Sequence, residues 1–197
     1  MSDTTTTPSS ARLLSTPGAL GLADLVAIFD DLQFTLKCCE QLVAELARPR
    51  PDAVLVEALW VSALNSYARC FRAGDRGLGL TLDDVKATGV PGEVAEWHEL
   101  LGRIRDFAID GPVNPREAYS VGVSQTAAGR AAGIVITSAP RPLVDDVTVR
   151  QTGRLAFELS RLVDERIKDH QQKVFAAAAR MTAEQLGALP AIEVTAG

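Results

Sequence analysis

The sequence is poor in the residues that build disulfide frameworks, metal sites and many catalytic centres. Its 197 residues include three cysteines, Cys38, Cys39 and Cys70, and two histidines, His98 and His170. The cysteines are odd in number and show no CxxC or Cys/His ligand spacing, so we expect neither a disulfide framework nor a zinc site. No acidic cluster with metal-ligand spacing replaces them. We therefore predict no metal and no cofactor.

The chain also lacks an excess of positive charge. It has 20 Lys+Arg against 25 Asp+Glu, a formal net charge of −5, and a pI near 5.1. This balance argues against a protein that coats nucleic acid by neutralising phosphates, although a local basic stripe remains open. The chain also contains no GxSxG, P-loop or GxGxxG motif, so neither a nucleophile elbow nor a nucleotide-binding loop is indicated.

Long hydrophobic runs are missing. No stretch approaches the roughly 18 to 20 uninterrupted apolar residues that span a bilayer, and the N-terminus has no basic segment ahead of an apolar one. We expect a cytoplasmic protein with reduced cysteines and no membrane association. With 47% hydrophobic residues, the chain can bury one sizeable core. We predict a disordered Ser/Thr/Pro-rich tail over 1–17, a single domain over 18–189, and a short flexible tail over 190–197.

Apolar residues recur at spacings of three and four along four long segments, which is typical of helices that pack along one face. The segments predicted as long helices are about 21–48, 52–72, 91–110 and 146–181. Pro91 is expected at the first helical position of the third. Two short helices are expected at 80–89 and 182–189. At about 117–137 the period changes to two, with Tyr119, Val121 and Val123 on one face, and this predicts one β-hairpin. The fold class is therefore mainly α: a bundle of about four main helices plus short helices, with one inserted hairpin.

Two residues of the third predicted helix stand out chemically. His98 and Arg105 lie seven residues apart, so they share a face on or beside the apolar stripe. Because an unpaired buried charge costs several kcal/mol, Arg105 is either paired with an acid such as Asp106 or Glu117, or exposed at a cleft or subunit contact. We expect His98 to be a packing residue and not a catalytic base. The same expectation holds for His170 of the long C-terminal helix.

A polar stripe lies beside the apolar face of the second predicted helix. Its members, spaced by three and four if the helix continues that far, are Ser62, Asn65, Arg69, Arg72 and Arg76. One interpretation is a solvated face with surface ion pairs. The other is a contact with an anion or an RNA backbone, because guanidinium groups bind phosphate bidentately.

Two stretches, EALWVSALNSYARCFRAG (57–74) and HELLGRIRDFAIDGPVNPREAYSV (98–121), resemble the HEPN superfamily of helical bundles. The similarity is to a mainly actinobacterial group in which a segment like the first precedes a helix that ends in an arginine-and-histidine turn. A hairpin and a long C-terminal helix follow there, as predicted here. The resemblance implies a HEPN-like helical domain and dimerisation through the central helices.

Active HEPN ribonucleases carry the motif R-x4-6-H, in which arginine and histidine from two protomers cleave RNA without metal. Arg105 matches the arginine, but positions 110–112 are Asp110, Gly111 and Pro112, so the histidine is missing. Neither glycine nor proline can move a proton near neutral pH, and Asp110 would be a weak base. His98 lies upstream on the helix and does not restore the motif.

We therefore expect a non-catalytic HEPN-like homodimer that acts by binding a protein partner or RNA, as in a toxin–antitoxin or phage-defence system. The expected binding residues are Arg105, with Arg69, Arg72 and Asn114 around one polar cleft. Two alternatives stay open. One is a metal-independent ribonuclease that uses Arg105 with Asp110 or His98, and the other is a structural or assembly subunit.

Overall fold

The computed structural model describes residues 11–73 and 77–192, and these form a mainly helical fold. The helices and strands in chain order are β1 (Ala11–Arg12), α1 (Pro17–Leu46), α2 (Ala53–Arg69), α3 (Leu82–Ala87), α4 (Val94–Ile109), β2 (Glu117–Gln125), β3 (Ala131–Pro140), α5 (Asp146–Ala178), α6 (Ala183–Gly187) and β4 (Ala191–Ile192). The predicted class, a helical bundle with an inserted hairpin, is confirmed.

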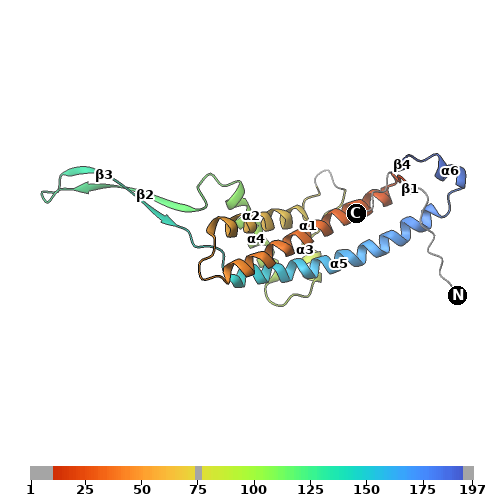
Figure 1. Cartoon of the computed structure of the whole chain (residues 1–197), viewed down its shortest axis with the longest axis horizontal. Coiled ribbons are helices and arrows are strands. Elements are labelled where there is room, and N and C mark those ends of the chain that lie inside the picture. Colours follow the sequence, from red (N-terminus) through yellow and green to blue (C-terminus); the bar gives the residue numbers. More distant parts are fainter. Residues whose placement is uncertain (1–10, 74–76, 193–197) are drawn as a thin grey trace.

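The bundle is built on α1, which packs along both α5 and α2, while α4 packs on α2 and α3 lies against α4 and α5. Figure 1 shows an elongated molecule in which the β2–β3 hairpin projects from one end and the distal parts of α1 and α5 extend to the other. The fully buried core side chains include Ile28, Leu32, Leu42, Leu64, Leu101, Leu155 and Leu159. They come from α1, α2, α4 and α5, so all four long helices share one core.

The helix starts follow from local capping chemistry. The Asp52 carboxylate accepts hydrogen bonds from the backbone N–H groups of Val54 and Leu55, which fixes the start of α2 as the sequence predicts. The prediction for the third helix is wrong at its start, because Pro91 precedes α4 by three residues. Gly92 has φ +94°, which is incompatible with a right-handed helix, so α4 begins only at Val94.

The chain ends differ from the predicted tails. Ala11–Arg12 pairs antiparallel with Ala191–Ile192, and the Arg12 guanidinium donates to the Leu189 carbonyl at 3.0 Å. Helix α1 already starts at Pro17, with the Thr16 hydroxyl as its cap. This strand pair is held by backbone hydrogen bonds and contributes nothing to the core, which is why apolar periodicity does not reveal it. Residues 1–10 and 193–197 of the predicted tails lie outside the described residues.

Helix α5 is buried over only half of its length. Its buried residues run from Val149 to Val163, although the predicted stripe continues to 181. Beyond Val163 the helix runs beside the first turns of α1, where Gly21 lies against the His170 imidazole. His170 is half-buried there, in line with the interpretation of this histidine as a packing residue.

Candidate functional site

Arg105 is a buried arginine on α4 that is paired with two acids. Its side chain is 9% exposed, and Nη1 donates to Asp106 Oδ1 at 2.9 Å and to Asp110 Oδ2 at 2.6 Å. The hydrogen bond with Asp106 raises the pKa of Arg105, burial lowers it, and the charge of Asp110 raises it further, with a net increase. Both carboxylates are mostly exposed. The interpretation of Arg105 as one half of a local ion pair is thus correct for Asp106, and the structure adds Asp110.

Asp110 is brought to Arg105 by the way α4 ends. Asp110 is the C-cap residue, and its backbone N–H donates to the Asp106 carbonyl. The chain then turns at Gly111, where a Cβ would lie 2.4 Å from the Phe107 carbonyl oxygen, so only glycine fits without a shift. Asp110 occupies the first of the positions where a HEPN motif would carry its histidine, and here that residue neutralises the arginine.

His98 is half-buried on α4 and contacts Tyr67 of α2 and Phe71, which follows α2. Its Nδ1 forms a 2.8 Å hydrogen bond with the Tyr67 hydroxyl, and its ring packs against the Phe71 ring at 4.3 Å between centroids, with the two planes tilted by 48°. Burial lowers the pKa of His98 and raises that of Tyr67, so both groups stay neutral at pH 7. The packing interpretation of His98 agrees with this geometry.

A polar groove of about 580 Å³ runs between α1 and α2. Its lining residues are Asp30, Asp31, Gln33, Phe34, Lys37, Ser62, Asn65, Ser66 and Arg69. Three members of the predicted polar stripe therefore do share one face. Arg69, however, is engaged: its Nε donates to Asp31 Oδ1 at 3.1 Å, and the same hydrogen bond raises the Arg69 pKa.

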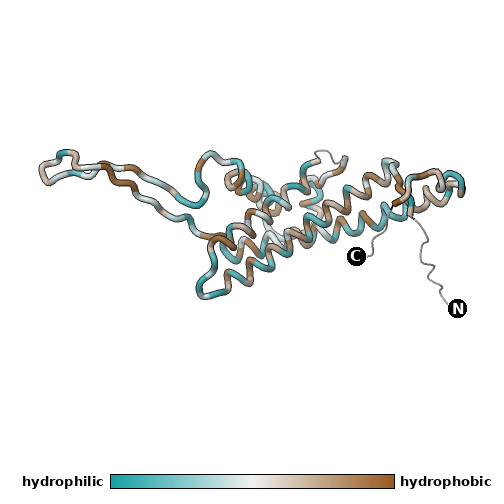
Figure 2. The backbone as a smooth tube through the Cα atoms, turned by 45° about the horizontal axis from the view of Figure 1, so that its top comes forward, coloured by the Kyte–Doolittle hydropathy of each residue, from teal (hydrophilic) through white to brown (hydrophobic). Residues whose placement is uncertain are grey.

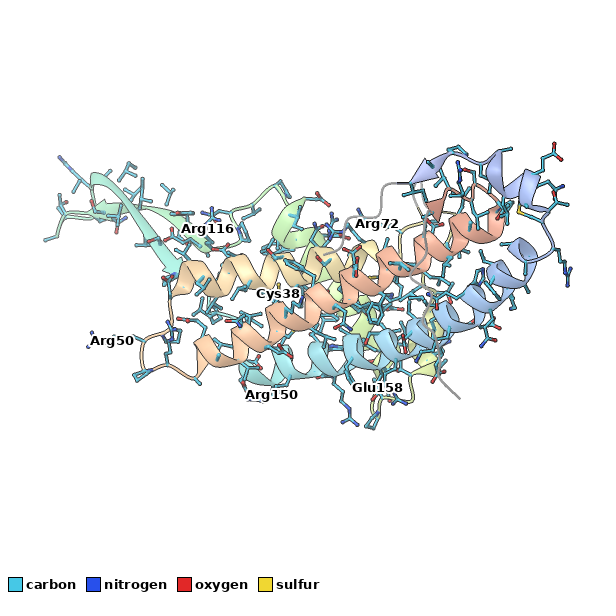
Figure 3. All side chains as sticks on the ribbon, turned by 45° about the vertical axis from the view of Figure 1, so that its right-hand side comes forward. Cys38, Arg50, Arg72, Arg116, Arg150 and Glu158 are labelled. Carbon is cyan, nitrogen blue, oxygen red and sulfur yellow. The ribbon has the colours of Figure 1, made fainter. Side chains whose placement is uncertain are left out.

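The four predicted binding residues do not surround one cleft. Arg69 lies in the α1–α2 groove, and Arg72 follows the end of α2. The turn that contains Asn114 lies at the opposite end of α2, where Arg116 pairs with Glu57 at 3.3 Å and its N–H donates to Asn114. A helix rises 1.5 Å per residue, so the two ends are separated by about 20 Å, and Figure 3 shows Arg72 and Arg116 well apart.

Two ion pairs that join separate helices, Asp31–Arg69 and Asp84–Arg166, were not predicted from the sequence. Asp31 is buried on α1 and receives Arg69, while Asp84 of α3 receives Arg166 of α5. Burial raises the pKa of Asp84, but hydrogen bonds from Arg166 and Thr81 outweigh it, and the net pKa is lowered. Each pair joins elements far apart in sequence. The only available signal was an acid within an apolar stripe, which does not identify its partner.

Within residues 11–73 and 77–192, no group of three or more His, Cys, Asp or Glu side chains is arranged to hold a metal ion. In the same part of the chain, no helix combines the length and the apolar character needed to cross a membrane. Comparison of the chain with protein-family models, curated proteins and solved structures gives no match. A functional proposal for this chain is therefore based on its sequence and structure alone.

Proposed function

We propose that this chain is a non-catalytic, HEPN-like interaction protein that acts by binding. The observation that carries the proposal is the state of Arg105, whose charge is neutralised by Asp106 and Asp110 in a nearly buried position. Metal-independent RNA cleavage needs a group that takes up and returns a proton near neutral pH. The imidazole of His98 is hydrogen-bonded to Tyr67, and that of His170 lies against Gly21. Among the described residues, the ion-pair partners of Arg105 are the two carboxylates and neither histidine.

The α1–α2 groove is the binding surface that we propose. Its volume falls within the range of about 300–1,000 Å³ that is usual for ligand sites. Its four charged residues are two acids and two bases, namely Asp30, Asp31, Lys37 and Arg69, and Arg69 is already paired. This balance suits a partner with groups of both charges better than a polyanion, and it favours a protein segment over an RNA backbone.

Phe34 supplies an anchor for such a segment. It lies in the polar groove and is 48% exposed. Aromatic side chains, phenylalanine included, are enriched at protein interfaces, and a few residues near the centre of an interface carry most of its binding free energy. The biological setting that we propose, a toxin–antitoxin or phage-defence system, follows from the resemblance to HEPN proteins.

The test compares two exposed phenylalanines. Phe34→Ala changes the groove, while Phe157→Ala changes a side chain of α5 that is 50% exposed and lies outside it. Tagged wild-type and variant proteins are expressed in the cells of origin, and bound proteins are quantified by mass spectrometry. We expect one protein to be retained by the wild type and by Phe157→Ala, and to fall at least tenfold with Phe34→Ala, since a buried aromatic anchor is worth about 2 kcal/mol or more.

RNA is assayed with the same preparations. Binding of labelled single-stranded RNA that falls with Phe34→Ala and rises in low salt would replace the protein partner by RNA. Equal capture by all three proteins, with no RNA bound, would contradict the assignment of the groove.

A further inference from the structure

One face of the β2–β3 hairpin carries five large apolar side chains, each more than half exposed. These are Tyr119, Val121, Val123, Ile134 and Ile136, each between 57% and 71% exposed. We call them the hairpin face. Figure 2 shows apolar segments along both strands, where the hairpin stands away from the helices.

The strand register places all five side chains on one side of the hairpin. Val121 pairs with Ile136 and Val123 pairs with Ile134. Directly opposite residues of an antiparallel pair point to the same face, and so do residues two apart along a strand. The hairpin face is therefore contiguous, whereas the opposite face is mostly small and polar: Ser120 pairs with Thr137, and Val135, which is 44% exposed, pairs with Gly122.

The hairpin has few of the charged side chains that usually protect an isolated pair of strands. Between Glu117 and Arg141 its only charged residue is Arg130, at the turn. Exposed strand edges are normally guarded by charged side chains or proline, and a two-stranded hairpin is marginally stable in water by itself. A surface that is apolar, contiguous and almost free of charge is typical of a protein contact.

The base of the hairpin is fixed to the bundle, so the hairpin face has a defined position. Arg116, just before β2, pairs with Glu57 of α2 at 3.3 Å. Arg141, just after β3, stacks over the Phe107 ring of α4 at 4.9 Å, and its N–H donates to the Arg116 carbonyl. These contacts attach the base of the hairpin to α2 and α4.

The chemistry of the hairpin face selects among possible occupants. With one arginine it cannot neutralise a nucleic-acid backbone, and its turn, residues 126–130, has no aromatic side chain to insert into a lipid surface. A nearly uncharged, β-branched face offers a dissimilar partner no charge pattern to recognise. Such a face is complementary to itself, and contacts between identical subunits are the more apolar class of interface.

The area is sufficient for a second copy. From their exposed fractions, the five side chains present roughly 500–600 Å² per chain, so complete burial of both faces would remove about 1,100 Å² in total from solvent, just above the ~1,000 Å² expected of a specific interface. We propose that two chains dimerise by packing their hairpin faces against each other around a two-fold axis. This contact is independent of the α1–α2 groove, and it differs from the contact through the central helices that the HEPN resemblance implies.

The test is the mass in solution, measured by light scattering after size exclusion over a range of micromolar concentrations. The chain has a mass of 21.0 kDa, so the wild type is expected to approach about 42 kDa as its concentration rises. Val121→Lys places a charge in the hairpin face, while Ser120→Lys places the same charge on the next residue and the opposite face. We expect Val121→Lys to remain near 21 kDa and Ser120→Lys to behave as the wild type.

Circular dichroism establishes that each variant is folded. If Val121→Lys fails to fold, Val121→Thr with Ile136→Thr keeps the β-branched shape and is expected to weaken dimerisation at least tenfold, because two methyl and two ethyl groups per dimer are replaced by hydroxyls. A wild type that stays monomeric overturns the proposal. So does a dimer that neither Val121→Lys nor the threonine pair weakens, or one that Ser120→Lys disrupts equally.

Discussion

Replacing Arg105 and replacing its two acids should have unequal effects, because only the arginine is buried. Arg105→Met removes two hydrogen bonds to exposed carboxylates, each worth about 0–1 kcal/mol, and keeps most of the buried stem. We expect the free energy of unfolding to fall by about 1–2 kcal/mol. Asp106→Ala with Asp110→Ala removes both acidic partners of an arginine side chain that is 9% exposed, and this should cost about 3 kcal/mol.

Urea denaturation at pH 7 measures these differences by linear extrapolation. The triple variant, Arg105→Met with both alanines, should match Arg105→Met within about 0.5 kcal/mol, since the acids are harmless once the charge has gone. A matched control is Arg103→Met, because Arg103 is 69% exposed and its ion pair with Glu99 spans 4.0 Å. A larger loss for Arg105→Met than for the acid pair, or a triple variant equal to the sum, would refute this account of Arg105.

Two further predictions follow from other buried groups. Burial lowers the pKa of His98 below its ordinary value, so its contribution to stability is complete above the unfolded pKa of about 6.5 and decreases as the pH falls toward the folded pKa. The melting temperature should therefore fall less from pH 7.5 to pH 5.5 for His98→Gln than for the wild type. An equal fall in melting temperature would contradict this prediction. Burial raises the pKa of Cys39 to about 12, so Cys39 of the native protein should resist alkylation at pH 8, whereas the urea-unfolded protein should react at once. Peptide mapping locates the labelled cysteines. Rapid labelling of Cys39 in the native protein would be inconsistent with this burial.

The helices were largely predictable because each carries local signals. The apolar spacing of α1, α2 and α4 and the cap at Asp52 act within a few residues, so they can be read from one stretch of sequence. The start of α4 was misplaced because Pro91 suits a first helical turn, whereas the deciding feature is the positive φ of Gly92. The strand pair at the chain ends joins residues about 180 positions apart, and no local pattern records such a contact.

The candidate site was predictable in its parts but not in its arrangement. Sequence reasoning identified Arg105 and an acid as its partner, because the helical period placed a charge beside the apolar stripe. It also placed Arg69, Arg72 and Asn114 with Arg105 around one polar cleft. In the structure Arg69 and the turn that contains Asn114 lie at opposite ends of α2. That arrangement depends on how the segment after α4 lies against α2, which side-chain type does not determine.

The most direct test of the central claim, that Arg105 holds the end of α4 and does not catalyse, is a metal-free RNA cleavage assay. Protein from a nuclease-deficient host is incubated with labelled RNA and a chelator from pH 5 to 9, as wild type, Arg105→Ala and Arg103→Ala. We predict no cleavage above the buffer control for any of the three. Cleavage by the wild type and Arg103→Ala that is lost in a folded Arg105→Ala would contradict the account and establish a ribonuclease that uses Arg105 with a base such as Asp110.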